Sequence, residues 1–249
     1  MFAEIPADQL ADALDACAAE ILWEASVTEP PVDAALIAER LGLVIAHNPA
    51  LACRGRLVEL ADPRGGVATQ GTIVVGPAER PERLQWAVAH EIGESVAYRV
   101  FGALGIRGED AAENARECVA NHLASCLLLP RDWFAADGDR LDWDLFALKQ
   151  RYATASHELI ARRMLEMNVP IVVTLFDQGR VRWRRSNSGG RPPELTCEES
   201  QAWKSAHEMG TRCRLDCDPE KSGLESTTAW PVHEPDWKRE IVRSCVVEW

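Results

Sequence analysis

Two long helical patterns separated by glycines constrain this sequence more than any other feature. In residues 81–101 apolar side chains recur at spacings of three and four, and Pro81 stands at the start of the pattern. A second pattern covers residues 109–129 and ends before Pro130, because proline cannot continue a helix. The residues that break the pattern between them are Gly102, Gly105 and Gly108. The sequence therefore predicts two long helices joined by a glycine-rich connection.

The N-terminal part predicts further helices and a small sheet. Residues 8–24 and 31–42 have helical periodicity, and Gly42 follows the last apolar position as a stop signal. Short runs rich in Val, Ile and Leu follow, separated by Gly, Pro and Asn, which is typical of strands. The predicted strands are residues 43–46, 56–60 and 72–75. We therefore expect residues 1–130 to form a mainly helical domain with a small sheet.

The C-terminal half contains a helical part and then a change of composition. Its predicted elements are helices over residues 141–151 and 156–167, strands over 171–176 and 180–183, and a turn at 137–139. The two helices resemble a helix-turn-helix, and the strands are typical of a β-hairpin. These elements occupy residues 131–185. Residues 186–249 begin with linker-like Ser, Gly and Pro and form a Cys- and Trp-bearing C-terminal extension. The predicted fold class is α+β.

The charge balance disfavours two classes of partner. The chain has 27 Lys and Arg residues against 39 Asp and Glu residues, a formal net charge of −12. Nucleic acids and anionic membranes are themselves negative, so neither is expected to bind such an acidic surface. The longest apolar run, residues 123–129, is far shorter than the about 20 residues that cross a bilayer. The N-terminus has no basic segment followed by an apolar run, so we predict a cytoplasmic protein with reduced thiols.

The clearest chemical motif is the segment His90-Glu91-Ile92-Gly93-Glu94 in the first long helix. Positions four apart lie on one face of a helix, so His90 and Glu94 aim at a common point, with Glu91 beside them. This is the layout of a zincin helix, in which residues i and i+4 hold a metal ion and the glutamate between them activates its water. In this chain the second ligand position is a glutamate instead of the usual histidine.

The second long helix supplies another carboxylate. Glu117 and Asn121 share a face of that helix. The Glu117 carboxylate could therefore complete the metal shell, while the Asn121 amide orients a ligand from behind. One helix would then provide two ligands and the other helix one.

Taken together, these motifs resemble the ImmA/IrrE family of metallopeptidases. The shared features are the predicted strand 72–75, the segment Ala89-His90-Glu91, the pattern Glu117-x-x-Ala120-Asn121-x-x-Ala124, the ending Leu127-Leu-Leu-Pro130, and the helix-turn-helix portion with Arg162 and Arg163. The resemblance covers roughly residues 15–185. It implies a zinc-dependent peptidase that cleaves a helix-turn-helix transcriptional repressor.

The resemblance and the helix spacing together give each motif residue a role. We predict His90, Glu94 and Glu117 as metal ligands, Glu91 as the general base, and Asn121 as support for a ligand. Such a shell is neutral around a dication, whereas two histidines and one glutamate would leave a charge of +1. A neutral centre polarises its bound water less, and its oxygen ligands shift the preference from zinc toward manganese or iron(II). We therefore predict weaker or different catalysis. Candidates for an oxyanion-stabilising residue are Tyr98, Tyr152, His122 and His157.

Two other functions stay open besides proteolysis of a regulatory, repressor-like protein. A catalytically inactive pseudo-peptidase would hold no metal and would use the fold as a binding or sensing module. A DNA-associated transcriptional regulator would act through the helix-turn-helix and a basic strand. The arginines of that strand are Arg180, Arg182, Arg184 and Arg185. The acidic net charge makes the regulator the third choice.

The C-terminal extension carries a weaker metal signal. Cys213 and Cys217 are four residues apart, which is not the short C-x-x-C spacing of a zinc knuckle. The other residues that could join them in a structural zinc site are Cys197, His207, His233 and Cys245. Because these are scattered along the chain, free thiols are the preferred interpretation.

Overall fold

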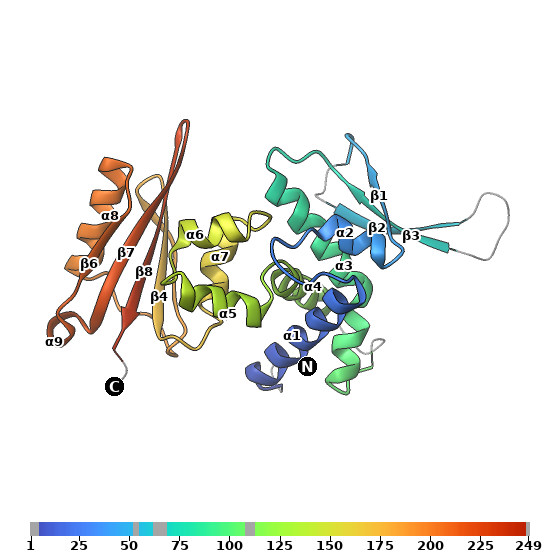
Figure 1. Ribbon diagram of the computed structural model, residues 1–249, viewed down its shortest axis with the longest axis horizontal. Helices are drawn as coiled ribbons and strands as arrows, with labels where there is room; N and C mark the ends of the chain where they lie inside the picture. The colour runs from blue at the N-terminus through green and yellow to red at the C-terminus, as the bar shows by residue number, and fades with distance from the viewer. Residues whose placement is uncertain (1–4, 52–54, 62–68, 108–112, 248–249) are drawn as a thin grey trace. The chain divides into compact units, whose positions relative to one another are not determined.

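The computed structural model describes residues 5–51, 55–61, 69–107 and 113–247. The chain divides into two compact units, one mainly helical with a three-stranded sheet and the other a five-stranded sheet with helices (Figure 1). Unit 1 comprises Met1–Trp143 with Lys149–Ser156, and unit 2 comprises Asp144–Leu148 with His157–Trp249. The α+β class predicted from the sequence is therefore correct. No helix in the described ranges combines the length and the apolar character that crossing a bilayer requires.

Unit 1 is built mainly from helices. Their bounds are α1 (Ala7–Glu24), α2 (Ala34–Arg40), α3 (Pro81–Ala103), α4 (Glu113–Leu128), α5 (Arg131–Arg140) and the last residues of α6 (Leu145–Arg151). The two predicted long helices are confirmed as α3 and α4, except that residues 109–112 of the second lie outside the described residues. The apolar stripes of both helices are buried, which explains why they form the core of this unit.

The predicted turn at residues 137–139 is wrong, because α5 continues through it. Glycine is usually a helix breaker, but at Gly138 it is required by packing. A Cβ built at this position would lie 2.5 Å from the ring of Trp143. Trp143 also contacts Phe134 edge-on, with ring centroids 5.8 Å apart. The glycine therefore marks a close contact beneath a tryptophan and not a chain reversal.

A three-stranded sheet completes unit 1. It consists of β1 (Val44–His47), β2 (Gly55–Ala61) and β3 (Thr69–Val75) in the order β1-β3-β2. β1 runs parallel to β3, and β2 runs antiparallel to it. The three predicted strands are confirmed, although β2 and β3 each begin earlier than expected. α3 packs against β2 and β3, so the edge strand β2 lies beside the helix that carries His90 and Glu91.

Unit 2 is a five-stranded antiparallel sheet with helices. Its elements are the first residues of α6, then α7 (His157–Met164), β4 (Ile171–Asp177), β5 (Arg180–Ser186), α8 (Cys197–Met209), β6 (Cys213–Asp216), α9 (Pro219–Ser222), β7 (Leu224–Glu234) and β8 (Trp237–Val246). The strand order is β5-β4-β8-β7-β6. The predicted hairpin is confirmed as β4 and β5, and the predicted second helix as the shorter α7.

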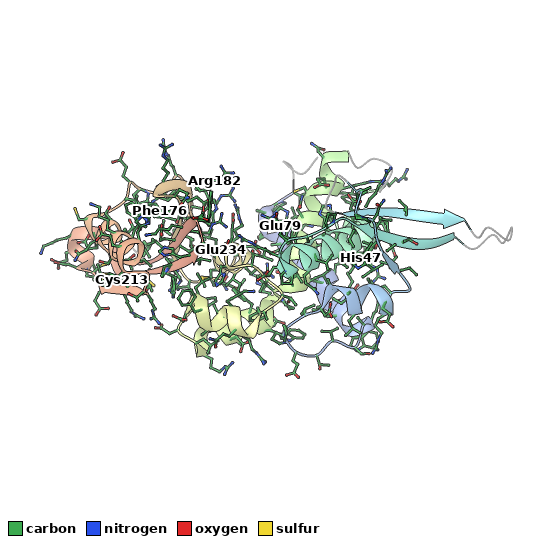
Figure 2. All side chains as sticks on the ribbon, turned by 90° about the horizontal axis from the view of Figure 1, so that it is seen from above. His47, Glu79, Phe176, Arg182, Cys213 and Glu234 are labelled. Atoms are coloured by element: carbon green, nitrogen blue, oxygen red, sulfur yellow. The ribbon has the colours of Figure 1, made fainter. Side chains whose placement is uncertain are left out.

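The chain after residue 186 supplies three strands and two helices that were not predicted from the sequence. α8 lies against the sheet, and the two meet in a core of Phe176, Ala202, Ala206, Ala229 and Val242. Phe176, labelled in Figure 2, stacks on Trp203 with ring centroids 4.5 Å apart. Three of these five residues are small alanines from α8 and β7, so the segment has no long apolar run that would reveal the core in the sequence.

Candidate metal centre

His90 and Glu94 lie one turn apart on α3 and point to a common region. The distance from His90 Nε2 to Glu94 Oε1 is 3.7 Å. Glu117 reaches the same nitrogen from α4, with its Oε2 at 3.5 Å. The ligand atoms of the three side chains all lie within 4.8 Å of one another. The structure therefore brings together, from two different helices, the three side chains that the sequence predicts as metal ligands.

These distances fit ligands around a common ion better than they fit direct hydrogen bonds. Good N–H···O bonds are about 2.7–3.2 Å long. In a tetrahedral zinc site with bonds near 2.1 Å, neighbouring ligand atoms are about 3.4 Å apart. Glu94 is 40% and Glu117 57% exposed at the side chain, whereas His90 is 15% exposed, so the cluster opens to solvent on its carboxylate side. One imidazole and two carboxylates thus form a suitable, accessible donor set for a divalent cation.

A glycine on α3 allows the two ligand-bearing helices to approach. A Cβ built at Gly93 would lie 2.9 Å from the carbonyl oxygen of Ala120 on α4. Real Cβ atoms do not come so close to a backbone oxygen, so any side chain at this position would push the helices apart. Gly93 follows Glu91 by two residues, and Ala120 follows Glu117 by three. The close approach is therefore part of what sets the separation between His90 and Glu117.

We expect Gly93→Val to lower the free energy of unfolding by about 1–3 kcal/mol, because its side chain would be forced against Ala120. It should also weaken metal binding by separating His90 from Glu117. Gly102→Ala is the matched control on the same helix: a Cβ there meets nothing within 4 Å, and alanine favours helix. Urea unfolding of both variants measures the effect. Wild-type stability in Gly93→Val would contradict the close helix approach.

Glu91 is buried next to the cluster of His90, Glu94 and Glu117 and is held by the edge strand β2. Its Oε2 accepts a hydrogen bond of 2.7 Å from the backbone N–H of Leu57 on β2. A Cβ at Gly55 would lie 2.9 Å from its Oε1, so glycine leaves room for the carboxylate. Burial raises the pKa of the Glu91 carboxyl and the charge of Glu94 raises it further, while His90 and the Leu57 N–H act in the opposite direction. Glu91 is thus a fixed carboxyl that holds its proton more readily than a free glutamic acid.

Asn121 supports Glu117 directly. Its Nδ2 donates to Glu117 Oε1 at 3.0 Å and to the backbone oxygen of Glu117 at 2.9 Å. Glu117 Oε1 is therefore engaged by the amide, while Oε2 is the oxygen nearest His90. This is the supporting contact that the sequence predicts for Asn121, and it orients the carboxylate. On the other side of the cluster, His90 Nδ1 is buried and has no hydrogen-bond partner among the described residues.

The candidates for oxyanion stabilisation are placed very differently from one another. Tyr152 is fully buried in unit 1, donates to Asp137 at 3.0 Å, and has a pKa that burial raises strongly, so it serves the core. His157 belongs to unit 2, where its ring contacts Phe146. Tyr98 on α3 is exposed, and His122 on α4 contacts the backbone oxygen of Cys118 through Nδ1 at 2.8 Å. Within unit 1, Tyr98 and His122 are therefore the candidates that lie at the surface.

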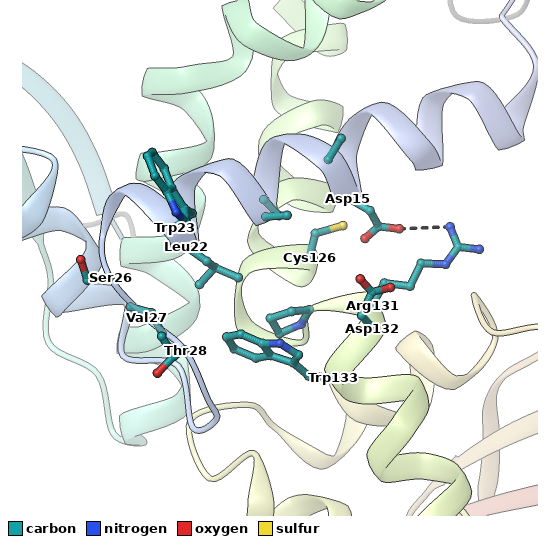
Figure 3. Close-up of a pocket in the computed structure, with 14 residues that line it drawn as sticks. Asp15, Leu22, Trp23, Ser26, Val27, Thr28, Cys126, Arg131, Asp132 and Trp133 are labelled. Atoms are coloured by element: carbon teal, nitrogen blue, oxygen red, sulfur yellow. Dashed lines mark hydrogen bonds and ion pairs between the residues drawn. The ribbon is translucent and has the colours of Figure 1, made fainter.

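Unit 1 also has a pocket of about 640 Å³ beside α1, which none of the five predicted site residues lines (Figure 3). Its walls include Leu22 and Trp23 from α1 and Trp133 from α5, so it is largely apolar. An ion pair of 3.3 Å between Arg131 and Asp15 closes one side. This pocket is separate from the cluster of His90, Glu94 and Glu117.

A helix that presents a histidine and two glutamates, with a third glutamate on a neighbouring helix, is the arrangement expected of a metallopeptidase-type domain. Residues 38–165 match the sequence profile of the Peptidase M78 family, described as the IrrE N-terminal-like domain. These residues make up just over half of the chain, and the protein belongs to this family. The resemblance inferred from the motifs is therefore confirmed.

The fold has a counterpart among solved structures. A Mycobacterium tuberculosis transcriptional regulator superposes with a TM-score of 0.64 at 16% sequence identity, over 94% of this chain and 75% of that chain. At this identity the likeness concerns the fold alone. Among curated protein sequences, none matches this chain significantly.

Proposed function

We propose that this protein is a metal-dependent endopeptidase that cleaves a regulatory protein of the repressor type. The observation that carries the proposal is the meeting of His90, Glu94 and Glu117 within 4.8 Å, from two helices held in close contact. The family supports peptidase chemistry of the metal-dependent kind. The openness of the carboxylate side of the cluster suits a substrate as large as a polypeptide.

Each residue of the cluster has a distinct part in this proposal. His90, Glu94 and Glu117 would hold the ion, with zinc as the first choice and manganese or iron(II) as alternatives that two oxygen ligands accommodate. When bound, the ion supplies Lewis-acid activation of water and of the scissile carbonyl. Glu91 would take a proton from the attacking water and return it to the leaving amine. Asn121 would keep the Glu117 carboxylate in position.

The proposed substrate class rests on the family resemblance, and the proposed cytoplasmic location rests on the free cysteine thiols. A repressor-like protein is the expected substrate, because the resemblance of the motifs implies one. All cysteines in the described part of the chain are free. Reduced thiols are typical of the cytoplasm, and they support the predicted cytoplasmic location.

Two observations argue against the alternative of a DNA-associated regulator. Arg184, from the predicted basic strand, forms a bidentate pair with the buried Glu199, with both N···O distances at 2.9 Å. Arg162 of α7 pairs with Glu158 at 2.9 Å and lies over the ring of Trp183 at 4.7 Å. These arginines are already neutralised inside unit 2, so they offer less attraction to phosphates than the sequence suggests. Metal binding at the cluster of His90, Glu94 and Glu117 distinguishes the proposed peptidase from the pseudo-peptidase alternative.

Removal of metal tests the proposed function. We expect the purified protein to cleave a helix-turn-helix repressor supplied as substrate, to lose this activity in a chelator, and to regain it when zinc, manganese or iron(II) is added back. Cleavage is followed by mass spectrometry of the products, and metal content by elemental analysis. Cleavage that survives complete removal of metal would refute the proposal. A wild-type chain that binds no metal at this cluster would leave the pseudo-peptidase as the better account.

A further inference from the structure

Unit 2 contains a second cluster of potential metal ligands, formed by His207 on α8, His233 on β7 and Glu240 on β8. Glu240 Oε1 lies 2.9 Å from His207 Nδ1 and 2.6 Å from His233 Nε2. One ligand atom from each residue lies within 4.8 Å of the others. The sequence alone suggested grouping His207 and His233 with cysteines. The structure instead joins the two histidines through a glutamate.

The topology of unit 2 explains why these three residues meet. β7 and β8 form a hairpin in which Pro231 pairs with Glu240, and Pro231 and His233 share a face because they are two residues apart. The same face carries Phe176 on β4, which pairs with Glu240 and stacks on Trp203 of α8. α8 therefore covers the face from which His233 and Glu240 project, and His207 joins them from the helix.

Glu240 lacks the counter-charge that a buried carboxylate normally needs. Its side chain is fully buried. Its partners are the two histidines and Trp203, whose Nε1 donates to Oε2 at 3.1 Å. None of the Lys or Arg side chains in the described ranges forms an ion pair with it. An uncompensated buried carboxylate is costly, so a cation bound between it and the two imidazoles would stabilise it.

We propose that His207, His233 and Glu240 bind a divalent transition-metal ion, at a site in unit 2 separate from the candidate centre in unit 1. Two imidazole nitrogens and one carboxylate oxygen are a common donor set for zinc and iron(II). The ion would replace the direct contacts between Glu240 and the two ring nitrogens, and the ligand atoms would separate to about 3.4 Å, the spacing of a tetrahedral site. The histidine side chains are 29% and 22% exposed, so they can move and leave open positions for water.

The bound ion would join α8 to the β7–β8 hairpin. His207 lies near the end of the helix, and the other two ligands lie on adjacent strands. A ligand that binds only the folded state raises its stability with increasing concentration. We therefore expect the unfolding midpoint of unit 2 to rise as Zn²⁺ is added, and to stop rising when the site is full.

Titration of the full chain with Zn²⁺ or Co²⁺ tests this proposal in a Glu117→Ala background, which removes a ligand of the first cluster. We expect one equivalent to bind, with Co²⁺ giving the visible absorption of a nitrogen- and oxygen-ligated ion. Glu240→Gln should weaken this binding at least about 100-fold, because a direct ligand matters more than a supporting contact. His47→Gln, at an exposed histidine of β1 (Figure 2), is the matched control and should bind like its parent.

Each outcome of this titration decides the proposal. Absence of a stoichiometric ion in the folded Glu117→Ala chain would overturn it and would leave the cluster as a hydrogen-bonded network. Full metal binding in Glu240→Gln would also overturn it. If Glu240→Gln fails to fold, the Glu117→Ala chain still decides: Co²⁺ must perturb the NMR signals of His207 and His233, and unperturbed signals would refute the site. Neither result depends on peptidase activity.

Discussion

Glu91→Gln is expected to abolish peptidase activity while leaving metal binding intact. The change keeps the size of the side chain, and its carbonyl oxygen can still accept the hydrogen bond from Leu57. It removes the only function that an amide cannot perform at this position, which is to take a proton from water. Loss of a general base lowers the rate by about 10²- to 10⁴-fold. Initial rates of substrate cleavage and elemental analysis of the same preparation measure the two effects.

Glu79→Gln provides the matched control for this variant. Glu79 also lies in unit 1, is 89% exposed at the side chain, and is labelled in Figure 2. Its replacement should change neither rate nor metal content. Full activity in Glu91→Gln would mean that another group is the base. Loss of metal in Glu91→Gln would mean that Glu91 is itself a ligand.

Glu91 should also make stability depend on pH in the metal-free protein. Its pKa is raised in the folded state, so the folded state binds the proton more tightly than the unfolded chain. The resulting stabilisation is complete below the unfolded pKa, about 4.3, and is lost as the pH rises through the raised folded pKa. The amide introduced by Glu91→Gln does not titrate. The stability of this variant relative to wild type should therefore increase with pH across this window and then level off.

Urea unfolding of both proteins at a series of pH values, in the presence of a chelator, measures this difference. A stability difference that does not change with pH would contradict a raised pKa for Glu91. A difference with the opposite slope would mean that the carboxylate is stabilised in the folded state, and its role as a proton acceptor would need another explanation.

The sequence was sufficient to predict which residues form the first cluster, because they pair at short spacings within single helices. His90 and Glu94 are four residues apart on one helix, and Glu117 and Asn121 are four residues apart on another, so helical geometry alone pairs them. What joins the two pairs is the approach of Gly93 to Ala120, and this is a packing contact between helices. No periodicity in the sequence indicates that contact, and only the resemblance to a family placed the helices together.

The second cluster could not be predicted, because its ligands come from a sheet with non-local order. β4 pairs with β8, although more than 60 residues separate them. Glu240 stands in the segment Trp237-Lys-Arg-Glu, whose charges are typical of an exposed strand. In the structure the face of β8 that carries Glu240 is covered by α8, whereas Arg239 on the other face pairs with Asp177. The position of α8 determines that Glu240 and not Arg239 is buried, and α8 is not part of the local sequence pattern around Glu240.

Glu117→Ala and Glu94→His are expected to change the metal affinity of the first cluster in opposite directions. Glu117→Ala removes the ligand from α4 and should weaken binding at least about 100-fold, since even supporting contacts are worth 10- to 100-fold. His90→Ala should do the same. Glu94→His replaces a carboxylate by an imidazole and gives the shell of two histidines and one glutamate, which leaves a charge of +1 on a bound dication. Its water should be more acidic, so both zinc affinity and activity should rise.

These variants are best compared in a chain that also carries His207→Gln, so that metal in unit 2 is not counted. Glu20→Ala, at an exposed glutamate of α1, controls for the loss of one negative charge. Zn²⁺ titration gives the affinities and cleavage assays give the rates. If Glu94→His binds zinc and cleaves substrate while the parent does neither, Glu94 has switched off a peptidase site, and the pseudo-peptidase describes the natural protein. If the parent already binds metal and loses it in Glu117→Ala, the carboxylate-rich shell is a working metal centre.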